Sequence, residues 1–390
     1  MNILFYYSRA LFPHDGGIAT ISLSLIEGLE GQGHVVTALG KQDLGKGKFL
    51  QRQYFLPSID VLSTDNVDYI CNILKEQSID VVINQQPIDD VAEELWTRVK
   101  KQTGIRIISC MHNPVTLSAK NFILKDENRI KKKKLGWVMP VLSTRSIKDI
   151  ILRAYIMKNK KRYQKIVANS DSVVVLCDGM KDELIEMIGH NDSKIKIIPN
   201  FLKSVPVFVP YEKKENVVVW CGQINFTVKR VDIMLAVWKK LQDIYPDWKL
   251  YILGDGPDVE AAKRLAKTLM LRNYCFEGRV DPSEYYRMAK YVVVTSSYES
   301  FSLVTLEAMA NSCIPVGFNT FPAASFLLGD SIDKLFVPPY DIKMLVQKIS
   351  EVETKSLGSS LQKTLYQRSC GFTSERIIGM WNRLLNDFIK

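Results

Sequence analysis

Two glutamates, Glu299 and Glu307, stand eight residues apart in the segment 291–318, which reads YVVVTSSYESFSLVTLEAMANSCIPVGF. The segment opens and closes with apolar runs at 291–294 and 314–318, which are typical of strands buried on both faces. Between these runs the sequence predicts a loop that carries Glu299 and a helix that carries Glu307. A carboxylate in each of these places could act on a ligand.

The predicted helix starts near the N-cap serines Ser300 and Ser302 and ends at Asn311. Its other residues are nearly all apolar, so the helix should be buried, and an ionised Glu307 there needs partners. Free N–H groups and the helix dipole favour an anion at the helix start. We expect a phosphate close to Glu299 and a polyol at Glu307. The alternative is a solvated Glu299 and a Glu307 paired with a basic side chain.

Length and composition indicate a globular protein of two domains. The chain has 390 residues, 46% apolar and 24% charged. No apolar run approaches the roughly 18 residues of a membrane span. The first residues, MNILFYYSRALFPHDGG, lack a basic region and indicate a strand rather than a secretory signal. The seven cysteines are scattered, with no CxxC motif, which favours a reducing cytoplasm.

Positive charge is concentrated between Lys120 and Lys165, a segment with fifteen lysines and arginines and only three acidic residues. The lysine run 131–134 lies at its centre. This region is either a solvated face or, as we prefer, an amphipathic surface that lies on anionic lipid, because apolar residues are interleaved with the basic ones. A nucleic-acid partner is not favoured, since no aromatic-rich binding module or zinc motif accompanies the charge.

Strands and helices alternate along both halves of the chain, which predicts two doubly wound parallel sheets. Residues 203–215, with two prolines and few helix formers, read as the linker between them. The predicted strands are 2–7, 35–39, 80–84, 105–110, 172–176, 195–198, 216–220, 249–253, 291–294 and 314–318.

Two features of the first half lie where ligands bind in such sheets. Gly16 and Gly17 precede the predicted helix 18–30, and paired glycines let a ligand approach backbone N–H groups. His112 follows the strand that ends at Cys110. A glycine pair is also common in a plain turn, and a lone histidine is often structural, so both readings stay open from the residues alone.

The phrase SxxESFSLxxLEAMA, followed by xPV, resembles the E-x7-E signature of the retaining glycosyltransferases of family 4. The resemblance implies that Glu299 touches the hydroxyls of a donor sugar and Glu307 the ribose of its nucleotide. The amides of Ser302, Leu303 and Val304 would hold the diphosphate.

The same resemblance extends to the cations of the donor site. Lys229, in the phrase CGQINFTVK, corresponds to the lysine that neutralises the donor phosphates. The position six residues earlier is usually an arginine in the family, and here it is Gln223. We therefore expect Lys229 to supply the positive charge alone, or Arg230 to substitute. Val280, after the FEG turn, would contact the base.

In the first half, the resemblance implies that Gly16 and Gly17 face the diphosphate and that His112 contacts the donor sugar. It implies the GT-B fold, in which two Rossmann-like domains face each other across a cleft. The boundaries that we expect are 1–203 with a closing helix at 373–390 for the acceptor-binding domain, and 204–372 for the donor-binding domain.

The function implied is retaining transfer of a hexose from a nucleotide diphosphate sugar, with UDP-hexose as the expected donor. The acceptor would be a saccharide, preferably lipid-linked, in cell-surface polysaccharide synthesis at the inner face of the membrane. No two aspartates stand two residues apart, so there is no DxD motif, and we expect metal-independent transfer without a cofactor. Alternatives are a catalytically silent partner that binds nucleotide sugars, which Gln223 keeps open, and a GT-B epimerase.

Overall fold

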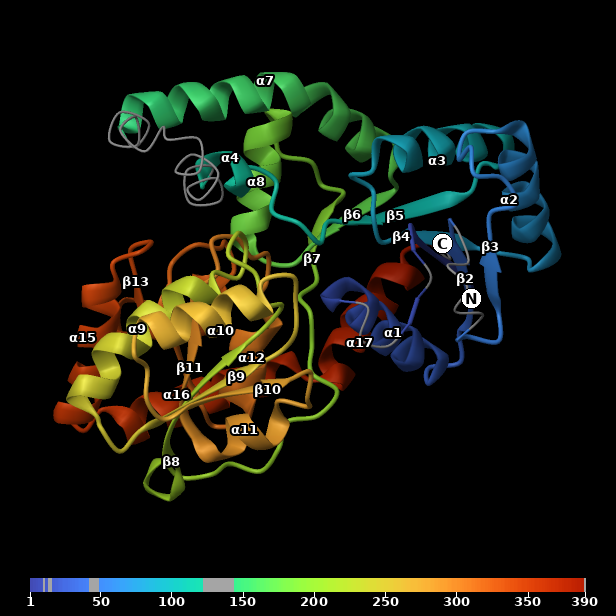
Figure 1. The fold of residues 1–390 in the computed structure, drawn as a ribbon. Helices are drawn as coiled ribbons and strands as arrows, with labels where there is room; N and C mark the ends of the chain where they lie inside the picture. Colours follow the sequence, from blue (N-terminus) through green and yellow to red (C-terminus); the bar gives the residue numbers. More distant parts are fainter. Residues whose placement is uncertain (10, 13–15, 42–48, 122–143, 389–390) are drawn as a thin grey trace. The chain divides into compact units, whose positions relative to one another are not determined.

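The computed structural model describes residues 1–9, 11–12, 16–41, 49–121 and 144–388. The chain forms two compact units, each built on one parallel sheet (Figure 1). Unit 1 comprises Met1–Thr116, Ala154–Lys203 and Ser374–Lys390, and unit 2 comprises Leu117–Arg153 and Ser204–Thr373.

Unit 1 has a seven-stranded sheet in the order β3-β2-β1-β4-β5-β6-β7, in which every neighbouring pair is parallel. Its strands are β1 (Asn2–Tyr7), β2 (Val35–Gly40), β3 (Gln53–Phe55), β4 (Val81–Asn84), β5 (Arg106–Cys110), β6 (Ser172–Val175) and β7 (Ile195–Ile197). Its helices include α1 (Gly17–Glu30), α2 (Thr64–Glu76), α3 (Asp90–Thr103), α8 (Asp178–Ile188), α17 (Ser374–Asn386) and the part of α7 (Arg145–Asn169) from Ala154 onward.

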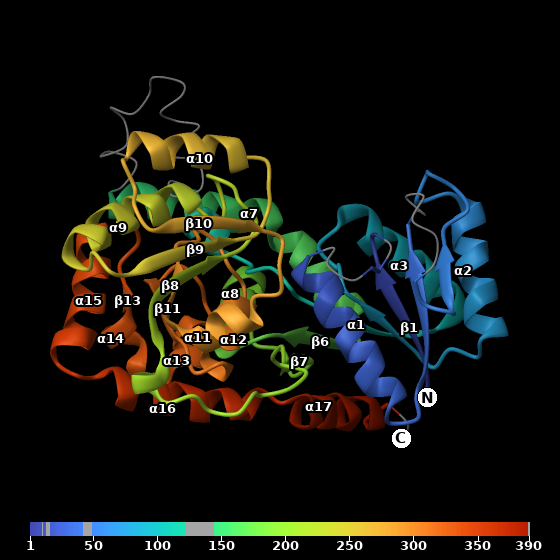
Figure 2. The ribbon, with the colours of Figure 1, turned by 60° about the horizontal axis from the view of Figure 1, so that its bottom comes forward.

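Strand β1 shows why this sheet is buried on both faces. Its side chains alternate between two cores, because successive residues of a strand point to opposite faces. Ile3 and Phe5 pack in one core with α1 and α17, which lie side by side in Figure 2. Leu4 and Tyr6 pack in the other core with α2 and α3.

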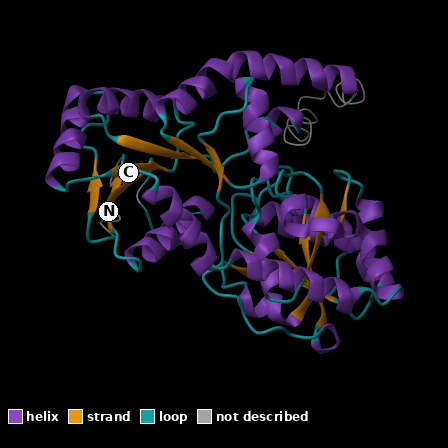
Figure 3. Cartoon of the chain, turned by 180° about the vertical axis from the view of Figure 1, so that it is seen from behind, coloured by secondary structure: helices purple, strands orange, loops and turns teal. Residues whose placement is uncertain are grey.

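Unit 2 has a six-stranded parallel sheet in the order β10-β9-β8-β11-β12-β13, with helices on both sides of it (Figure 3). Its strands are β8 (Glu215–Cys221), β9 (Lys249–Leu253), β10 (Tyr274–Gly278), β11 (Ala289–Val294), β12 (Ile314–Phe318) and β13 (Phe336–Val337). Its helices include α4 (Leu117–Lys120), α9 (Val231–Ile244), α10 (Val259–Thr268), α11 (Ser283–Met288), α12 (Leu303–Ala310), α13 (Ala324–Leu328), α14 (Ile332–Leu335), α15 (Ile342–Thr354) and α16 (Gly358–Ser369).

The predicted fold class, with two parallel sheets in a doubly wound α/β arrangement, is confirmed. One boundary differs from the expectation, because Leu117–Arg153 groups with unit 2 rather than with the first domain. The basic region is described only in part. Residues 122–143, which include the lysine run 131–134, lie outside the described residues, and the helix α7 (Arg145–Asn169) carries the rest. Within the described ranges, no helix is long and apolar enough to cross a bilayer.

Candidate active site

The loop between β8 and α9 is organised by Asn225. Its side-chain oxygen accepts hydrogen bonds from the backbone N–H groups of Val228 at 2.8 Å and Lys229 at 2.9 Å. Its amide nitrogen donates to Oε1 of Gln223 at 3.1 Å. An asparagine that closes a turn in this way fixes the backbone that follows it. Asn225 therefore fixes the backbone position from which the side chain of Lys229 extends.

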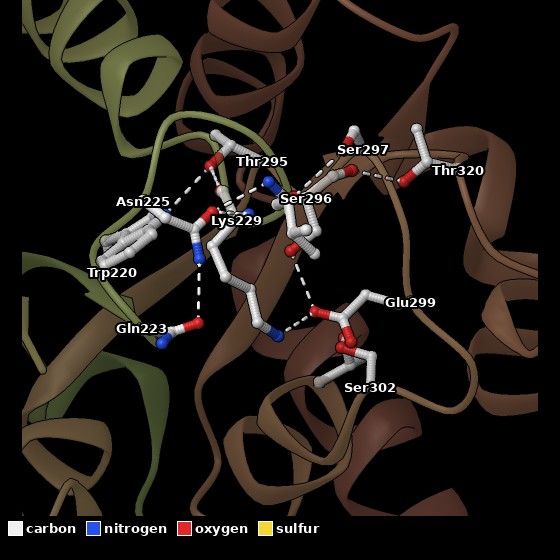
Figure 4. A network of polar contacts seen from close by, with 12 residues as sticks. Trp220, Gln223, Asn225, Lys229, Thr295, Ser296, Ser297, Glu299, Ser302 and Thr320 are labelled. Carbon is white, nitrogen blue, oxygen red and sulfur yellow. Dashed lines mark hydrogen bonds and ion pairs between the residues drawn. The ribbon is translucent and has the colours of Figure 1, made fainter. Parts of the chain in front are cut away.

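A second set of hydrogen bonds ties this loop to the one that follows β11 (Figure 4). The hydroxyl of Thr295 donates to the carbonyl of Lys229 at 2.9 Å, and the hydroxyl of Ser297 donates to the carbonyl of Thr227 at 2.8 Å. The indole N–H of Trp220 donates to the hydroxyl of Thr295 at 2.9 Å. Two loops from neighbouring parallel strands are thus held together at the carboxyl edge of the sheet.

Lys229 and Glu299 meet at this edge. The ammonium group of Lys229 donates to Oε1 of Glu299, and the hydroxyl of Ser296 donates to the same oxygen at 2.9 Å (Figure 4). The two charged side chains are 25% and 14% exposed, so the pair is partly shielded from water. A partly buried cation beside a carboxylate suits a ligand that carries both phosphates and hydroxyl groups.

The carboxyl group of Glu307 has no hydrogen bond or ion pair with any described residue, although the residue lies within α12 and is only partly exposed. Burial and, to a smaller extent, the charge of Asp281 raise the pKa of its carboxyl, Lys229 opposes the shift, and the resulting pKa is about 7. The side chain is therefore neither free in solvent nor locked onto a basic neighbour. A carboxylate in this state gains most from a ligand that donates hydrogen bonds to it.

The start of α12 is open to an anion. The residue before it, Ser302, adopts the left-handed conformation with a φ of 59°, and its hydroxyl bonds that of Thr305 at 2.8 Å instead of capping the helix. In the described part of the chain, no protein acceptor takes the N–H groups of Leu303 and Val304. Together with the amide of Ser302, these are the amides that the family resemblance implies for the diphosphate.

Gly254 and Gly256 allow the loop after β9 to pack closely against the loop after β8. A Cβ atom on Gly254, whose φ is +132°, would lie 1.9 Å from the carbonyl oxygen of Gly222. A Cβ atom on Gly256 would lie 2.3 Å from the carbonyl oxygen of Ile224. Only glycine allows the two loops to touch backbone to backbone here. The GDGP motif at 254–257 supplies both of these glycines.

Arg230 departs from its expected role as a substitute phosphate cation. Its side chain is buried, its guanidinium donates to both carboxylate oxygens of Asp232 and to the hydroxyl of Tyr340 at 2.6 Å, and it stacks on the Tyr340 ring. Because the guanidinium binds Asp232 in the first turn of α9, we infer that Arg230 stabilises the start of this helix instead of binding a phosphate. Gln223 is exposed and Val280 is 40% exposed, so both are accessible.

Unit 1 holds the remaining predicted residues at the carboxyl edge of its own sheet. Gly16 precedes α1 with a φ of +102°, and both it and Gly17 are exposed. His112 follows β5 and contacts the side-chain oxygen of Gln85 through Nε2. Burial lowers the pKa of His112 to about 4, so the imidazole is neutral at pH 7.

The loop after His112 is held by Glu183, a buried residue of α8 that sequence analysis missed. One carboxylate oxygen accepts hydrogen bonds from the N–H groups of Val115 at 2.7 Å and Thr116 at 3.0 Å. The surrounding sequence, DELIEM, looks like an ordinary charged helix face, so no local pattern marks this residue.

Comparison with known families agrees with this architecture. A family model described as Glycosyltransferase Family 4 matches residues 15–203, and a model described as Glycosyl transferases group 1 matches residues 207–369. The first match covers most of the segments of unit 1, and the second lies within unit 2.

Individual relatives are distant. An exopolysaccharide phosphotransferase of Streptomyces coelicolor is 25% identical over 56% of this chain and 24% of its own length. The amylovoran biosynthesis glycosyltransferase AmsD of Erwinia amylovora is 26% identical over 45% of this chain and 50% of its own length. The chain thus spans half or less of the length of these two relatives. HepE of Anabaena, solved with UDP-glucose, has a TM-score of 0.70 at 14% identity, with 99% of this chain and 100% of that chain covered. The two family models and the fold together show that this chain belongs to the family 4 glycosyltransferases, with the GT-B fold.

Proposed function

We propose that this chain transfers a hexose from UDP-hexose to a saccharide acceptor, with retention of configuration and without a metal ion. The observation that carries the proposal is Glu307, a partly buried carboxylate with no partner among the described residues, beside the open amides of α12 and the Lys229–Glu299 pair. Such a set offers acceptors for ribose and sugar hydroxyls and donors for a diphosphate.

In this proposal the ribose hydroxyls donate to Glu307, and the diphosphate accepts hydrogen bonds from the amides of Ser302, Leu303 and Val304. Lys229 neutralises the charge that develops on the leaving diphosphate as its bond to the anomeric carbon breaks. The acceptor hydroxyl attacks from the face that the diphosphate leaves, which retains configuration, and its proton passes to the departing phosphate oxygen.

Glu299 has the role of binding sugar hydroxyls, and no covalent nucleophile is assigned. The donor must therefore share Lys229 with Glu299, because these two side chains form an ion pair. In the proposal His112 contacts the donor sugar, and the amides of Gly16 and Gly17 bind the diphosphate. The positive field comes from Lys229 and backbone N–H groups, which is why no metal is required.

The choice of donor and pathway is supported by relatives. HepE was solved with UDP-glucose, and AmsD is named for amylovoran biosynthesis. We propose UDP-hexose as the donor and cell-surface polysaccharide synthesis as the setting on this basis.

The acceptor in this proposal is lipid-linked, and the basic region 120–165 lies on the anionic inner face of the cell membrane. The described part of this region supports contact with lipid, because Ile150 and Met157 of α7 are 61% and 80% exposed among basic residues. Apolar residues are not confined to one face along the whole helix, so the amphipathic pattern is local. Flotation with anionic vesicles tests this part, and no binding at low salt would refute it.

The central experiment measures hexose transfer with Lys229→Ala and Glu299→Ala. Each change should reduce transfer at least about a hundredfold, because Lys229→Ala removes the cation that stabilises the leaving diphosphate and Glu299→Ala removes the charged acceptor for the sugar hydroxyls. The neighbouring exposed residue Thr227 provides a control, and Thr227→Ala keeps its backbone contacts. Transfer within a few fold of wild type in either variant would refute the assignment.

A silent nucleotide-sugar-binding partner remains the second candidate, because Gln223 stands where a second cation is expected and bonds only Asn225 among the described residues. A thermal-shift screen across nucleotide sugars detects binding in both cases. Donor hydrolysis without acceptor separates them, since only an active transferase releases UDP. Recovery of an isomerised donor would indicate an epimerase instead.

A further inference from the structure

A small cavity lies beside His112 in unit 1. Its volume of about 20 Å³ is enough for roughly one water molecule. The lining residues include Ser22, Gln85, His112, Asn200 and Trp381. The hydroxyl of Ser22 and the amide nitrogen of Gln85 have no hydrogen-bond partner among the described residues, and these two residues are 1% and 2% exposed. Buried polar groups of this kind are normally satisfied, so the cavity calls for a polar occupant.

Gln85 is held firmly in place. It directly follows β4, and its backbone N–H donates to the carbonyl of Tyr6 in β1 at 2.9 Å. Its side-chain oxygen contacts Nε2 of His112. An amide oxygen can only accept, so in this arrangement the proton of His112 is on Nε2 and Nδ1 keeps its lone pair. No described residue bonds Nδ1, and the imidazole is only partly buried.

We propose that Gln85 is a positioning residue for His112. Its oxygen holds Nε2–H, and its amide nitrogen is anchored by a water that Ser22 shares in the cavity, so that Nδ1 accepts a hydrogen bond from a hydroxyl of the donor sugar. This inference rests on the proposed function for the sugar contact, while the tautomer and the water stand on the geometry of unit 1 alone.

The alternative orientation of the amide makes the opposite prediction. If the nitrogen of Gln85 faced His112, Nε2 would be the acceptor and Nδ1 would carry the proton, so the imidazole would donate to the sugar. The two arrangements differ in where one proton lies. The low pKa of His112 keeps the ring neutral in either case at pH 7.

Nitrogen-15 NMR of the imidazole rings distinguishes these two tautomers, because a protonated and an unprotonated ring nitrogen have different chemical shifts. The spectrum can be assigned because the chain has only four histidines, at 14, 34, 112 and 190. The His112 signals are assigned by their loss in His112→Asn, and His34 and His190 serve as internal references. We expect Nε2 protonated at pH 7 and no protonation of the ring above about pH 5. A proton on Nδ1, or a charged ring at pH 7, would overturn the proposal.

Two substitutions test the role of Gln85. In Gln85→Glu a carboxylate faces Nε2 and raises the pKa of His112, so the ring should be charged at pH 7 and kcat/KM for the donor should fall about tenfold. In Gln85→Leu no side-chain oxygen favours the tautomer of His112 that is protonated on Nε2. The spectrum should then show both tautomers, and kcat/KM for the donor should fall about tenfold. Spectra and kcat/KM that match wild type in both folded variants would refute positioning.

A further comparison separates this inference from the proposed function. If His112→Asn transfers sugar normally while wild-type His112 shows the expected tautomer, the sugar contact is wrong, and the proposal fails even though the enzyme is a transferase. If Lys229→Ala also transfers normally, the proposed function fails as well. Loss of transfer in His112→Asn, together with the expected spectrum, supports the inference.

Discussion

The ammonium group of Lys229 donates to a carboxylate oxygen of Glu299, across 70 residues of sequence, at the carboxyl edge of one parallel sheet. The cation that we propose for the donor phosphates is therefore paired with the carboxylate that we propose for the donor sugar. In the proposed function a nucleotide competes with Glu299 for Lys229, whereas the donor sugar gains a hydrogen-bond acceptor from Glu299.

This competition predicts opposite effects on product binding and on transfer. Glu299→Gln removes the negative charge that repels the diphosphate, so UDP should bind about tenfold more tightly, on the order of 1.4 kcal/mol. Transfer should nevertheless fall, because the sugar loses a charged hydrogen-bond acceptor. Calorimetric titration with UDP and a transfer assay measure the two effects. UDP binding that is weakened together with transfer would show that Glu299 does not compete for Lys229.

Glu307 predicts a pH dependence of nucleotide affinity. Its free pKa is raised to about 7, and ribose hydroxyls that donate to the carboxylate would lower it in the complex. Binding then requires loss of a proton below pH 7, so affinity should fall by up to about tenfold per pH unit as the pH drops from 7. Above pH 7 the affinity should be constant.

The matched variant for this prediction is Glu307→Gln, which cannot ionise. Its UDP affinity should be lower at pH 8 and should stay level until the phosphate itself protonates near pH 6, about one unit below the wild-type onset. Calorimetric titrations at several pH values provide the measurement. Parallel profiles for wild type and variant would mean that Glu307 does not meet the ribose.

The sequence was informative wherever the signal was local. Strand ends and helix starts placed Lys229, Glu299 and Glu307 at one edge of one sheet, because parallel strands bring their carboxyl ends together. The turn made by Asn225 is also a local pattern that could have been predicted, since asparagine side chains commonly bond backbone N–H groups a few residues on. Asp232, two residues after Arg230, is a comparable local signal for the pair that takes Arg230 out of the expected site.

Contacts between distant segments had no such signal. The Lys229–Glu299 pair depends on the directions of two flexible side chains 70 residues apart. The close approach of Gly254 to Gly222 depends on the spacing of neighbouring strands, which no sequence pattern states. Such features follow from packing after the fold is formed.

Gly254→Ala should destabilise unit 2 strongly. The new Cβ atom meets the Gly222 carbonyl at 1.9 Å in a backbone conformation with a φ of +132°, so both loops must shift. We expect a loss of roughly 3 kcal/mol in the free energy of unfolding. Gly278→Ala is the control, because its φ is +73° but no atom lies within 4 Å of the added Cβ. It should cost about 1 kcal/mol. Urea unfolding followed by tryptophan fluorescence gives both values, and equal losses would refute the packing argument.

Glu183→Ala should destabilise unit 1 and disturb the loop that carries His112. The change leaves the buried N–H groups of Val115 and Thr116 without their acceptor, which should cost roughly 3 kcal/mol of unfolding free energy. Asp182→Ala removes the exposed carboxylate one residue earlier and should cost less than about 0.5 kcal/mol. Urea unfolding measures both, and hydrogen exchange at residues 115 and 116 tests the cause directly. Faster exchange of these two amides in Glu183→Ala, but not in Asp182→Ala, is expected because their protection comes from one carboxylate. Unchanged exchange would show that the loop is held by its own backbone.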